Sequence, residues 1–395
     1  MHLKHFPFRH LRIPKEYTTL PRSIKIAFFI FLIYYLGWGI VMAYYSIYLK
    51  KILGNYSSVG YVFAMYHTAS LIVSLLLGIL LDKVNKQKII RFILLFYFPF
   101  SYIFLKIRNL SQFLAFKIYH GTIATSLWVS VEAYIRKHSP KKRTIESIAL
   151  FDLGPTLALV IGGFLGAFLI TLYSFNIFYA ISLFAFLAFL IAIFLPDHEK
   201  TNFNINLLKG IKKEFIDFKK NIKLRKLSLA LFLYILAMGT IPMILPLFLR
   251  HIGATLWQIG IIFAISNIPF LFEGVFALFK ERKRTLISAI FIGIVIFTFL
   301  FFIRNILLIF IISFLISICF SAITPIISGK LTETMPKTKR GELSGMLSAI
   351  RNIGFILSTL AAGFISDALG LNFVFAFDAI ILLLLLFVVS RIEFE

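Results

Sequence analysis

The chain is poor in cysteine and in charged residues, and it lacks the short motifs of common enzymes. It carries one cysteine, Cys319, and only 15% of its 395 residues are charged. A single cysteine excludes a disulfide within one chain and a metal site built from thiolates. The sequence has no GxxxxGK(S/T), HExxH, CxxC or GxSxG pattern, the usual signatures of ATP hydrolysis, zinc peptidases, dithiol chemistry and serine hydrolases. We therefore expect no enzymatic activity, no cofactor and no resident metal.

Acidic residues are scarce as well. The 17 Asp and Glu against 41 Lys and Arg give a formal net charge of +24. Such an excess is typical of nucleic-acid-binding proteins, but here the basic residues lie between long apolar runs. Hydrophobic residues make up 60% of the chain and its mean hydropathy is +0.93, whereas a soluble domain holds about 45–50% apolar residues. The sequence indicates a polytopic membrane protein that binds no nucleic acid.

Apolar runs long enough to cross a bilayer, about 20 residues each, recur along almost the whole chain. The hydrocarbon holds no water to satisfy backbone groups, so each run must form a helix. Alternating segments of about ten residues, typical of a membrane β-barrel, are absent from the sequence. We predict an all-α membrane protein with twelve transmembrane helices, at residues 26–49, 57–81, 89–105, 111–135, 145–172, 174–195, 227–249, 257–279, 285–303, 305–328, 342–367 and 371–390.

The basic residues predict which side of the membrane each loop occupies. When the amino terminus and every second connection are placed on one side, that side holds 33 Lys and Arg residues and the other holds 6. Positively charged loops stay in the cytoplasm, so we expect a plasma-membrane protein with both termini cytoplasmic. The first run is longer than the apolar region of a signal peptide, and we expect it to remain a span. The net charge then reflects topology and attraction to anionic membrane lipids.

The longest break between apolar runs divides the chain into two halves. It begins Pro196-Asp197-His198 and carries the basic segment KKEFIDFKKNIKLRK. We predict an N-terminal six-helix bundle over 1–195, a basic cytoplasmic linker over 196–226 and a C-terminal six-helix bundle over 227–395. The linker pattern favours an amphipathic surface helix, with a regulatory or partner-binding segment as the alternative.

The two halves resemble each other at an offset of 200 residues. The aligned pairs are Gly39/Gly239, Gly60/Gly260, Ala64/Ala264, His67/Asn267, Asp152/Asn352 and Gly163/Gly363. Because six is an even number of spans, both copies have the same orientation in the membrane, which predicts two pseudo-symmetric bundles. Parallel repeats about an axis normal to the membrane, with a site between them at the midplane, are typical of a secondary transporter.

The loop after the second span carries the sequence GILLDKVNKQK over residues 78–88. It resembles the signature loop of the major facilitator superfamily, Gly-x-x-x-Asp-basic-x-Gly-basic-basic, and the resemblance extends over all twelve spans. Asn85 stands in place of the second glycine, and because asparagine tolerates a left-handed turn we expect the loop to keep its shape. Gly154-Pro155 and Gly162-Gly163 in span five resemble most closely the drug or solute:proton antiporter branch, with a wider spacing between the two pairs.

The resemblance implies a conformational gate formed by Gly78, Asp82, Lys83, Lys86 and Glu132. In this family the loop acid, here Asp82, packs at the cytoplasmic start of span eleven and stabilises the outward-facing state, because a helix amino terminus favours negative charge. Basic residues nearby connect it to an acid at the inner end of span four, here Glu132. The alternative for Glu132 is a local ion pair with Arg136, one helical turn away.

Span four places several polar side chains on one face. Lys117, His120, Trp128 and Glu132 fall within a stripe about 120° wide, so they can face one cavity. Lys117 stands where many antiporters of this family carry an arginine, and lysine keeps the charge without the forked geometry. The alternative for Lys117 is snorkelling toward the outer headgroups. His120 is either a proton carrier or a structural histidine.

Charges inside spans cost about 2.5 kcal/mol or more on insertion scales, so each one needs an explanation, functional or structural. Span five carries Asp152, span eight Glu273 and span eleven Arg351. A buried carboxylate can bind and release a proton as its site opens to either side. The proton-coupling candidates are therefore Asp152, Glu273 and His120, and the alternative for each acid is a permanent ion pair with Arg351.

A further set of side chains is expected to line the solute cavity, because the residues are aromatic, amide-bearing or charged within spans. The substrate-cavity candidates are Tyr35, Trp38, His67, Lys117, Trp128, Asn267, Arg351 and Asn352.

These features predict a secondary active transporter that moves a small solute across the plasma membrane by alternating access. Proton-coupled efflux of amphipathic compounds is favoured because the cavity candidates combine aromatic side chains with few charges. One alternative is a proton-linked transporter of a sugar or organic anion, in either direction, with Arg351 and Lys117 as anion partners. Another is a non-transporting membrane receptor or assembly protein on the same fold. We expect a proton as the coupling ion, with sodium as the alternative, and one chain as the transport unit.

Overall fold

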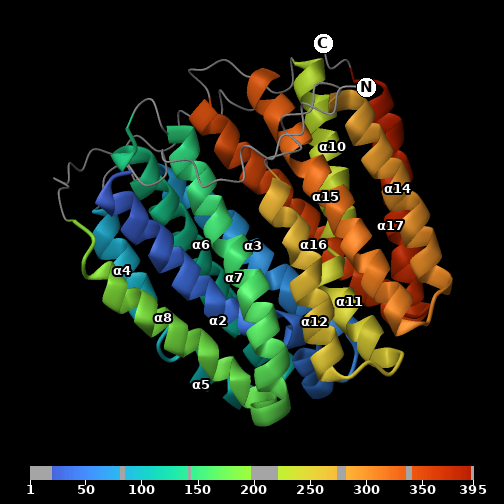
Figure 1. Cartoon of the computed structure of the whole chain (residues 1–395), viewed down its shortest axis with the longest axis horizontal. Coiled ribbons are helices and arrows are strands. Elements are labelled where there is room, and N and C mark those ends of the chain that lie inside the picture. Colours follow the sequence, from blue (N-terminus) through green and yellow to red (C-terminus); the bar gives the residue numbers. More distant parts are fainter. Residues whose placement is uncertain are drawn as a thin grey trace, which may run out of the picture.

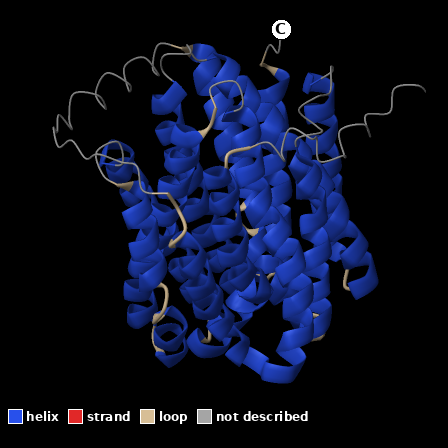
Figure 2. Ribbon diagram, turned by 60° about the vertical axis from the view of Figure 1, so that its left-hand side comes forward, coloured by secondary structure: helices blue, strands red, loops and turns tan. Residues whose placement is uncertain are grey.

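The computed structural model describes residues 20–80, 85–140, 144–196, 221–273, 282–334 and 340–392. Throughout these ranges the chain forms helices joined by short connections, with no strand (Figure 2). The long helices run side by side through the height of the molecule (Figure 1). The prediction of an all-α fold is confirmed, and its physical cause is the need to satisfy every backbone group inside the helix.

The helices of the two halves follow the predicted spans closely. The first half contains α2 (Arg22–Leu53), α3 (Tyr56–Leu80), α4 (Lys86–Phe96), α5 (Phe100–Lys106), α6 (Leu110–His138), α7 (Thr144–Tyr173), the 3₁₀ helix η3 (Ser174–Phe178) and α8 (Tyr179–Ala192). The second half contains α10 (Ile222–Met238), α11 (Ile241–His251), α12 (Leu256–Asn267), the 3₁₀ helix η4 (Ile268–Phe272), α14 (Arg282–Phe302), α15 (Ile306–Thr334), α16 (Arg340–Ala368) and α17 (Asn372–Ser390).

Nine stretches of the described residues are long and apolar enough to cross a membrane, and Leu256–Phe272 is a shorter apolar helix. One of the nine, Leu150–Ala192, holds 43 residues, about twice the length needed for one crossing. It turns back at Ser174, whose φ is 50°, and so supplies two crossings. Helix α6, with 29 residues, is also long enough to cross. The chain thus has the twelve-helix architecture that the sequence predicts.

Helices at equivalent places in the two halves begin and end with the same kinds of capping residue. Gly54 ends α2 with a left-handed φ of 81°, and Gly253 follows α11 with a φ of 93°. Asn55 then accepts a hydrogen bond from the Ser58 amide at the start of α3 (2.7 Å). Thr255, at the equivalent position of the second half, caps α12 by accepting from the Gln258 amide (3.2 Å). Short polar side chains are preferred at these positions because they satisfy the free amides of the first turn.

Three spans differ from the continuous helices expected. The third span breaks between α4 and α5 at Pro99, and the seventh breaks between α10 and α11 at Gly239 and Thr240. The eighth continues from α12 into η4, where Pro269 lies. Proline removes an amide donor and glycine weakens a helix interior, which accounts for all three. Helix α10 begins at Ile222, inside the predicted linker, and most of that linker, 197–220, lies outside the described residues.

Helices of the same half pack together, and three helix pairs make most of the contact between the halves. In the first half α2 packs along α7 and α8, and α3 along α6; in the second, α14 packs along α17, and α10 along α15, α16 and α17. The halves meet through α3 with α16, α7 with α12, and α2 with α11. We call the end where α2 begins and α17 ends the near end. The far end holds the connections 53–56, 106–110, 251–256, 302–306 and 368–372.

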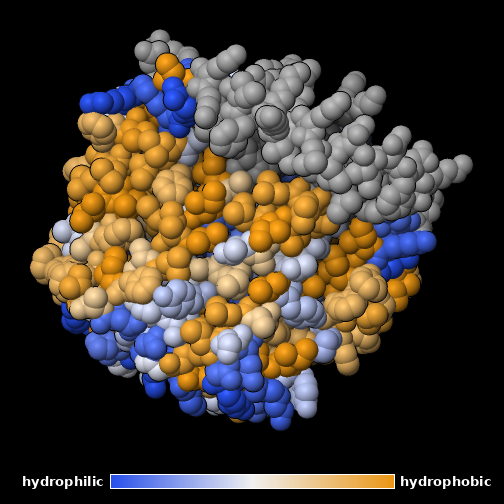
Figure 3. All heavy atoms as spheres, turned by 180° about the vertical axis from the view of Figure 1, so that it is seen from behind, coloured by the Kyte–Doolittle hydropathy of each residue, from blue (hydrophilic) through white to orange (hydrophobic). Residues whose placement is uncertain are grey.

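An apolar belt surrounds the bundle between its two ends. Figure 3 shows a broad band of hydrophobic side chains bordered at the far end by hydrophilic ones. Large side chains inside the helices, such as Leu183, Phe291 and Ile380, are more than half exposed in this belt. Soluble monomers rarely expose contiguous apolar patches of this extent, so lipid must cover the belt.

Candidate functional site

The two halves are joined at the far end by close helix contact. A Cβ atom added to Gly60 of α3 would lie 2.5 Å from the carbonyl oxygen of Thr359 and 3.4 Å from the Cα atom of Gly363, both in α16. In the other junction, a Cβ on Gly163 of α7 would lie 2.8 Å from the Cβ of Ala264 in α12. At both junctions the glycines leave no room for a side chain, which lets the two helix backbones approach closely. The pairs correspond through the 200-residue repeat, so the junctions are pseudo-equivalent.

A carboxylate from the second half completes the far-end contact. Asp367, in the last turn of α16, accepts hydrogen bonds from the amides of Tyr56 (2.9 Å) and Ser57 (2.7 Å) and from the Ser57 hydroxyl (2.5 Å). These amides belong to the first turn of α3, which has no carbonyl partners within its own helix. Asp367 therefore caps α3 from the opposite half. The sequence reasoning did not select this residue as a site residue.

Near the middle of α3, the α3/α16 junction includes a polar contact. The Nδ1 atom of His67 lies 3.3 Å from Oδ1 of Asn352, and the His67 ring stacks on Phe355 at 4.5 Å between centroids. Asn352 also donates to the Ser348 carbonyl oxygen (2.9 Å). The structure thus brings together two of the predicted cavity residues from different halves. Toward the near end, Ile72, Leu75 and Leu76 of α3 are about half exposed.

Both acidic candidates belong to the other junction, and one of them, Asp152, is equivalent to Asn352 in the repeat. Asp152 on α7 is exposed although it lies within a membrane-spanning helix, and Glu273 follows η4 directly. Asp152 and Glu273 interact electrostatically with each other and with Arg351 of α16. No ion pair within 4.0 Å joins these three described side chains, and the Arg351 guanidinium donates to Ser328 Oγ at 3.2 Å. The close ion pair considered as an alternative is not formed in this conformation.

Lys117 and His120 form a second, buried polar group on α6. The Lys117 Nζ atom lies 3.3 Å from His120 Nδ1 and 4.2 Å from the centre of the Tyr45 ring, and Lys117 is only 4% exposed. The His120 ring stacks on Trp38 at 4.6 Å with an interplanar angle of 2°. Lys117 therefore does not snorkel to the surface here, because an aromatic ring system stabilises its ammonium group instead.

The other predicted aromatic cavity residues pack between α2, α6 and α7. Trp128 lies 6.2 Å from Tyr35 and 5.0 Å from Phe151, centroid to centroid, and both Tyr35 and Trp128 are half-buried. Asn267, the repeat partner of His67, donates to the Phe263 carbonyl oxygen (2.8 Å) and is also half-buried. These residues combine partly accessible ring faces with one amide.

The predicted gate is described only in part. Asp82 and Lys83 lie outside the described residues, and Gly78 lies in the last turn of α3. Lys86 begins α4 and is buried. Glu132 accepts from the Arg136 guanidinium at 2.6 Å and 3.1 Å, which is the local pair considered as its alternative.

Asn85 does not adopt the left-handed conformation expected to preserve the loop, and residues 81–84 of that loop lie outside the described residues. Its φ of −72° and ψ of 108° are extended, not left-handed, and its side chain accepts from the Lys88 amide (3.0 Å) to cap α4. Asparagine has two favoured uses, left-handed turns and helix N-caps. The sequence pattern alone does not distinguish them.

Within the part of the chain that the structure describes, no group of three or more His, Cys, Asp or Glu side chains is arranged to hold a metal ion.

The comparisons with known proteins agree with this architecture. Residues 27–280 and 270–393 match the family profile of the Major Facilitator Superfamily. The chain is 24% identical over 360 residues, 87% of its length and 91% of the relative's, to an uncharacterized MFS-type transporter of Methanocaldococcus jannaschii.

Three solved structures share the fold at low sequence identity. They are the nucleoside transporter NupG (TM-score 0.77, 14% identity, covering 95% of this chain and 100% of that one), a bacterial homolog of the human lysosomal transporter Spinster (0.74, 13%, 93% and 96%) and the human organic anion transporter MFSD10 (0.70, 15%, 93% and 100%). Family profile, relative and fold all lead to the same assignment: the chain belongs to the major facilitator superfamily and is a multi-pass membrane transporter of that type.

Proposed function

We propose that the protein is a proton-coupled secondary transporter that exports amphipathic compounds by alternating access. The observation that carries the proposal is the shared site of Asp152, Glu273 and Arg351. The first lies on one half and the other two on the opposite half, and they interact electrostatically without a close ion pair. A carboxylate that is not committed to a salt bridge is free to take up a proton when the site faces one side and release it when the site faces the other.

The aromatic and amide side chains beside this site support an amphipathic solute. Tyr35 and Trp128 are half-buried with ring faces close to one another, and Asn267 and Asn352 place amides on the opposite half. Cavities of this kind hold apolar ligands by their aromatic walls and orient them by a few polar groups.

The orientation follows from charge. The near end carries most of the Lys and Arg residues, by the 33-to-6 division of the sequence, and positive loops stay cytoplasmic. We therefore place the near end and both termini in the cytoplasm and the far end outside the plasma membrane, with one chain as the transport unit. In that orientation the far-end closure described above is an inward-facing conformation.

The decisive experiment measures proton movement in proteoliposomes that enclose a pH-sensitive dye. The liposomes are challenged with a panel of lipophilic cations, organic anions and sugars. Solute-dependent proton flux opposite to the solute gradient is expected, and either Asp152→Asn or Glu273→Gln should abolish it. Glu333→Gln is the matched control, because Glu333 is an acid on a span that pairs with Arg282 at 2.5 Å, away from the site.

Each other outcome points to a definite alternative. Solute flux without proton movement would show that coupling is to sodium or absent. Proton and solute moving in the same direction would make the protein a symporter. Silence across the whole panel, from protein that is folded, would favour a non-transporting receptor or assembly protein.

One observation favours a second candidate, an organic anion as the solute. Lys117 is 4% exposed, and no carboxylate within 4.0 Å pairs with it among the described residues. A buried cation is costly unless an anion compensates it. A solute carboxylate or sulfonate that reaches His120 and Lys117 would provide that compensation. If the protein transports the anions of the solute panel in preference to the cations and sugars, the solute is an organic anion.

A further inference from the structure

The far end carries few charged residues, and they are gathered in one place. Six Lys and Arg residues lie in the far-end connections or within one helical turn of them: Lys50, Lys51, Lys106, Arg108, Arg250 and Arg304. All except Arg304 line two neighbouring cavities of about 420 Å³ each, which share Lys51 and Phe175. No acidic residue is among the described side chains that line either cavity. Such a concentration of unpaired positive charge attracts anions.

One of these cavities spans the seam between the halves, and we call it the seam cavity. Lys50 and Lys51 enter it from the end of α2, and Arg250 and His251 enter it from the end of α11. The two helices occupy equivalent places in the repeat, and their bases do too: Lys50 Nζ donates to the Gly54 carbonyl oxygen, and Arg250 donates to the Ala254 carbonyl oxygen at 3.2 Å. Four basic side chains therefore face one space from opposite halves.

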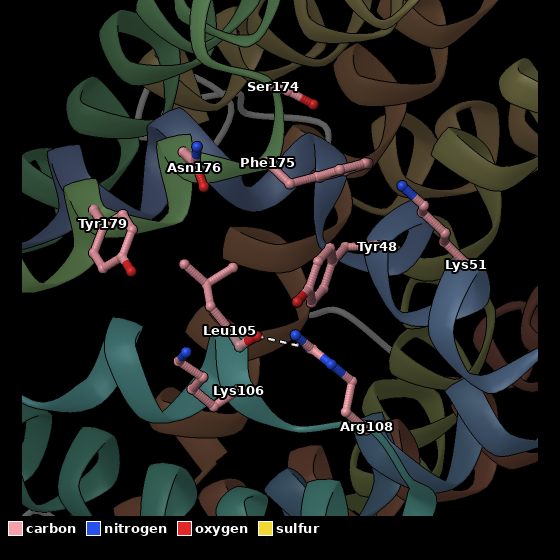
Figure 4. Close-up of a pocket in the computed structure, with 9 residues that line it drawn as sticks. All are labelled: Tyr48, Lys51, Leu105, Lys106, Arg108, Ser174, Phe175, Asn176 and Tyr179. Carbon is pink, nitrogen blue, oxygen red and sulfur yellow. Dashed lines mark hydrogen bonds between the residues drawn. The ribbon is translucent and has the colours of Figure 1, made fainter.

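The second cavity continues the same basic surface along the first half. Figure 4 shows Arg108 between Tyr48 and the Leu105 carbonyl oxygen, to which it donates at 2.7 Å, with Lys106 and Asn176 around the same space. Lys51 lies over the Phe175 ring at 5.4 Å, on the wall that the two cavities share. Hydroxyl, amide, ammonium and guanidinium donors thus surround a space far larger than a halide ion requires.

The nearest carboxylate does not neutralise this surface. Asp367 interacts electrostatically with Lys50, but its oxygens are engaged by the amides of Tyr56 and Ser57 and by the Ser57 hydroxyl. Closing the far end therefore brings the bases of α2 and α11 together with one carboxylate nearby, and their mutual repulsion opposes closure.

We propose that the seam cavity binds a phosphate group presented from the far-end side, and that the bound phosphate stabilises the far-end-closed conformation. Arginine matches phosphate oxygens with its fork, and lysine adds point charges. Because the bases come from both halves, opening the far end separates them and lowers the affinity. A ligand that binds one conformation better shifts the population toward it. The proposal is independent of which solute or coupling ion the transporter uses.

The test uses the full chain with spin labels on Tyr173→Cys and Trp257→Cys, in a Cys319→Ala background. These positions are exposed, at the far ends of α7 and α12 in different halves. Double electron–electron resonance then reports the closed fraction. In phosphatidylcholine nanodiscs, added inorganic phosphate should raise the closed fraction above the level in chloride of equal ionic strength. Lys51→Gln and Arg250→Gln should each raise the half-saturating phosphate concentration about tenfold, as expected for loss of one charge-assisted contact.

Two further arms complete the design. Arg304→Gln is the matched control, because this far-end base lines neither cavity and donates to the carbonyl oxygens of Phe301 and Ile303. Nanodiscs containing phosphatidylglycerol, without free phosphate, test whether a lipid headgroup is the source. A response to either phosphate or phosphatidylglycerol that requires Lys51 and Arg250 supports the proposal and identifies the source. No response to either, or an equal loss in the Arg304 variant, overturns it.

Should Arg250→Gln weaken the end of α11, Arg250→Lys keeps the charge there. Arg250→Lys should raise the half-saturating phosphate concentration less than Arg250→Gln does, because only the forked geometry of the guanidinium is lost. Equal shifts from these two variants in folded protein would contradict a role for the guanidinium.

Discussion

The contact of Asp367 with the first turn of α3 gives the sharpest prediction. Asp367→Asn keeps one acceptor oxygen and removes the negative charge, so the three hydrogen bonds from Tyr56 and Ser57 are weakened together. Because these bonds join opposite halves, the substitution should destabilise the far-end-closed conformation without unfolding either half.

The magnitude follows from helix capping. Removing an N-cap acceptor costs about 0.5–2 kcal/mol, and bonds to a charged acceptor are stronger than neutral ones. Asp367 is exposed to solvent, which screens its charge and keeps the effect moderate. We expect a loss of about 1–2 kcal/mol, so the ratio of closed to open molecules should fall about 5- to 30-fold.

The assay is the distance distribution between labels on Tyr173→Cys and Trp257→Cys, without added phosphate. Ser57→Ala removes the hydroxyl donor alone and should give a smaller fall than Asp367→Asn. Ser366→Ala is the matched control, because the Ser366 hydroxyl donates only within α16, to the Ala362 carbonyl oxygen at 2.6 Å. It should leave the distribution unchanged.

The reasoning would be refuted by an unchanged distribution in Asp367→Asn, or by equal falls in Asp367→Asn and Ser366→Ala. The first result would mean that water replaces the carboxylate at no cost. The second would mean that any change at this end of α16 loosens the junction.

Three further predictions concern other parts of the transporter. Asp82→Asn should slow turnover in a transport assay while leaving solute affinity in a binding assay unchanged; lost binding would contradict the gate role. Lys117→Met should raise the melting temperature in detergent, because it removes a buried charge that no carboxylate compensates. The same variant should bind an anionic solute about tenfold more weakly, or weaker still. A lower melting temperature would show that the contact of Lys117 with the Tyr45 ring outweighs the cost of burying the lysine. Gly163→Val should reduce the closed fraction, since overpacking against Ala264 costs about 1–3 kcal/mol, whereas Gly329→Val, where an added Cβ meets nothing within 4 Å, should not.

The sequence predicts the bundle well because the membrane leaves few choices. Each apolar run had to be a helix, and small residues repeated at an offset of 200 marked the helix junctions. The helix breaks at Gly239 and Pro269 were less predictable, since a break inside an apolar run depends on which neighbours can satisfy the freed backbone groups.

Some residues of the candidate site could be predicted from the sequence and others could not, and the difference has a physical reason. Charges inside spans are expensive, so Asp152, Glu273 and Arg351 could be selected one by one, and in the structure both acids interact electrostatically with Arg351. Asp367 was missed because an acid at the end of an apolar run is typical of an ordinary headgroup contact. Its partners are mainly backbone amides, which leave no pattern in the sequence.

The family resemblance and the structure together imply two opposed contacts on one pair of helices. Helices α3 and α16 run in opposite directions, so the carboxyl end of each lies beside the amino end of the other. At the far end Asp367 of α16 caps α3, and the resemblance implies that Asp82, after α3, does the same for α16 at the near end. If each contact forms in one conformation only, the population depends on the difference between two similar energies. Asp82→Asn should then raise the closed fraction at the far end and Asp367→Asn should lower it. The double variant should return the distance distribution close to that of the wild type, and a double variant that matches either single one would show that the contacts are not opposed.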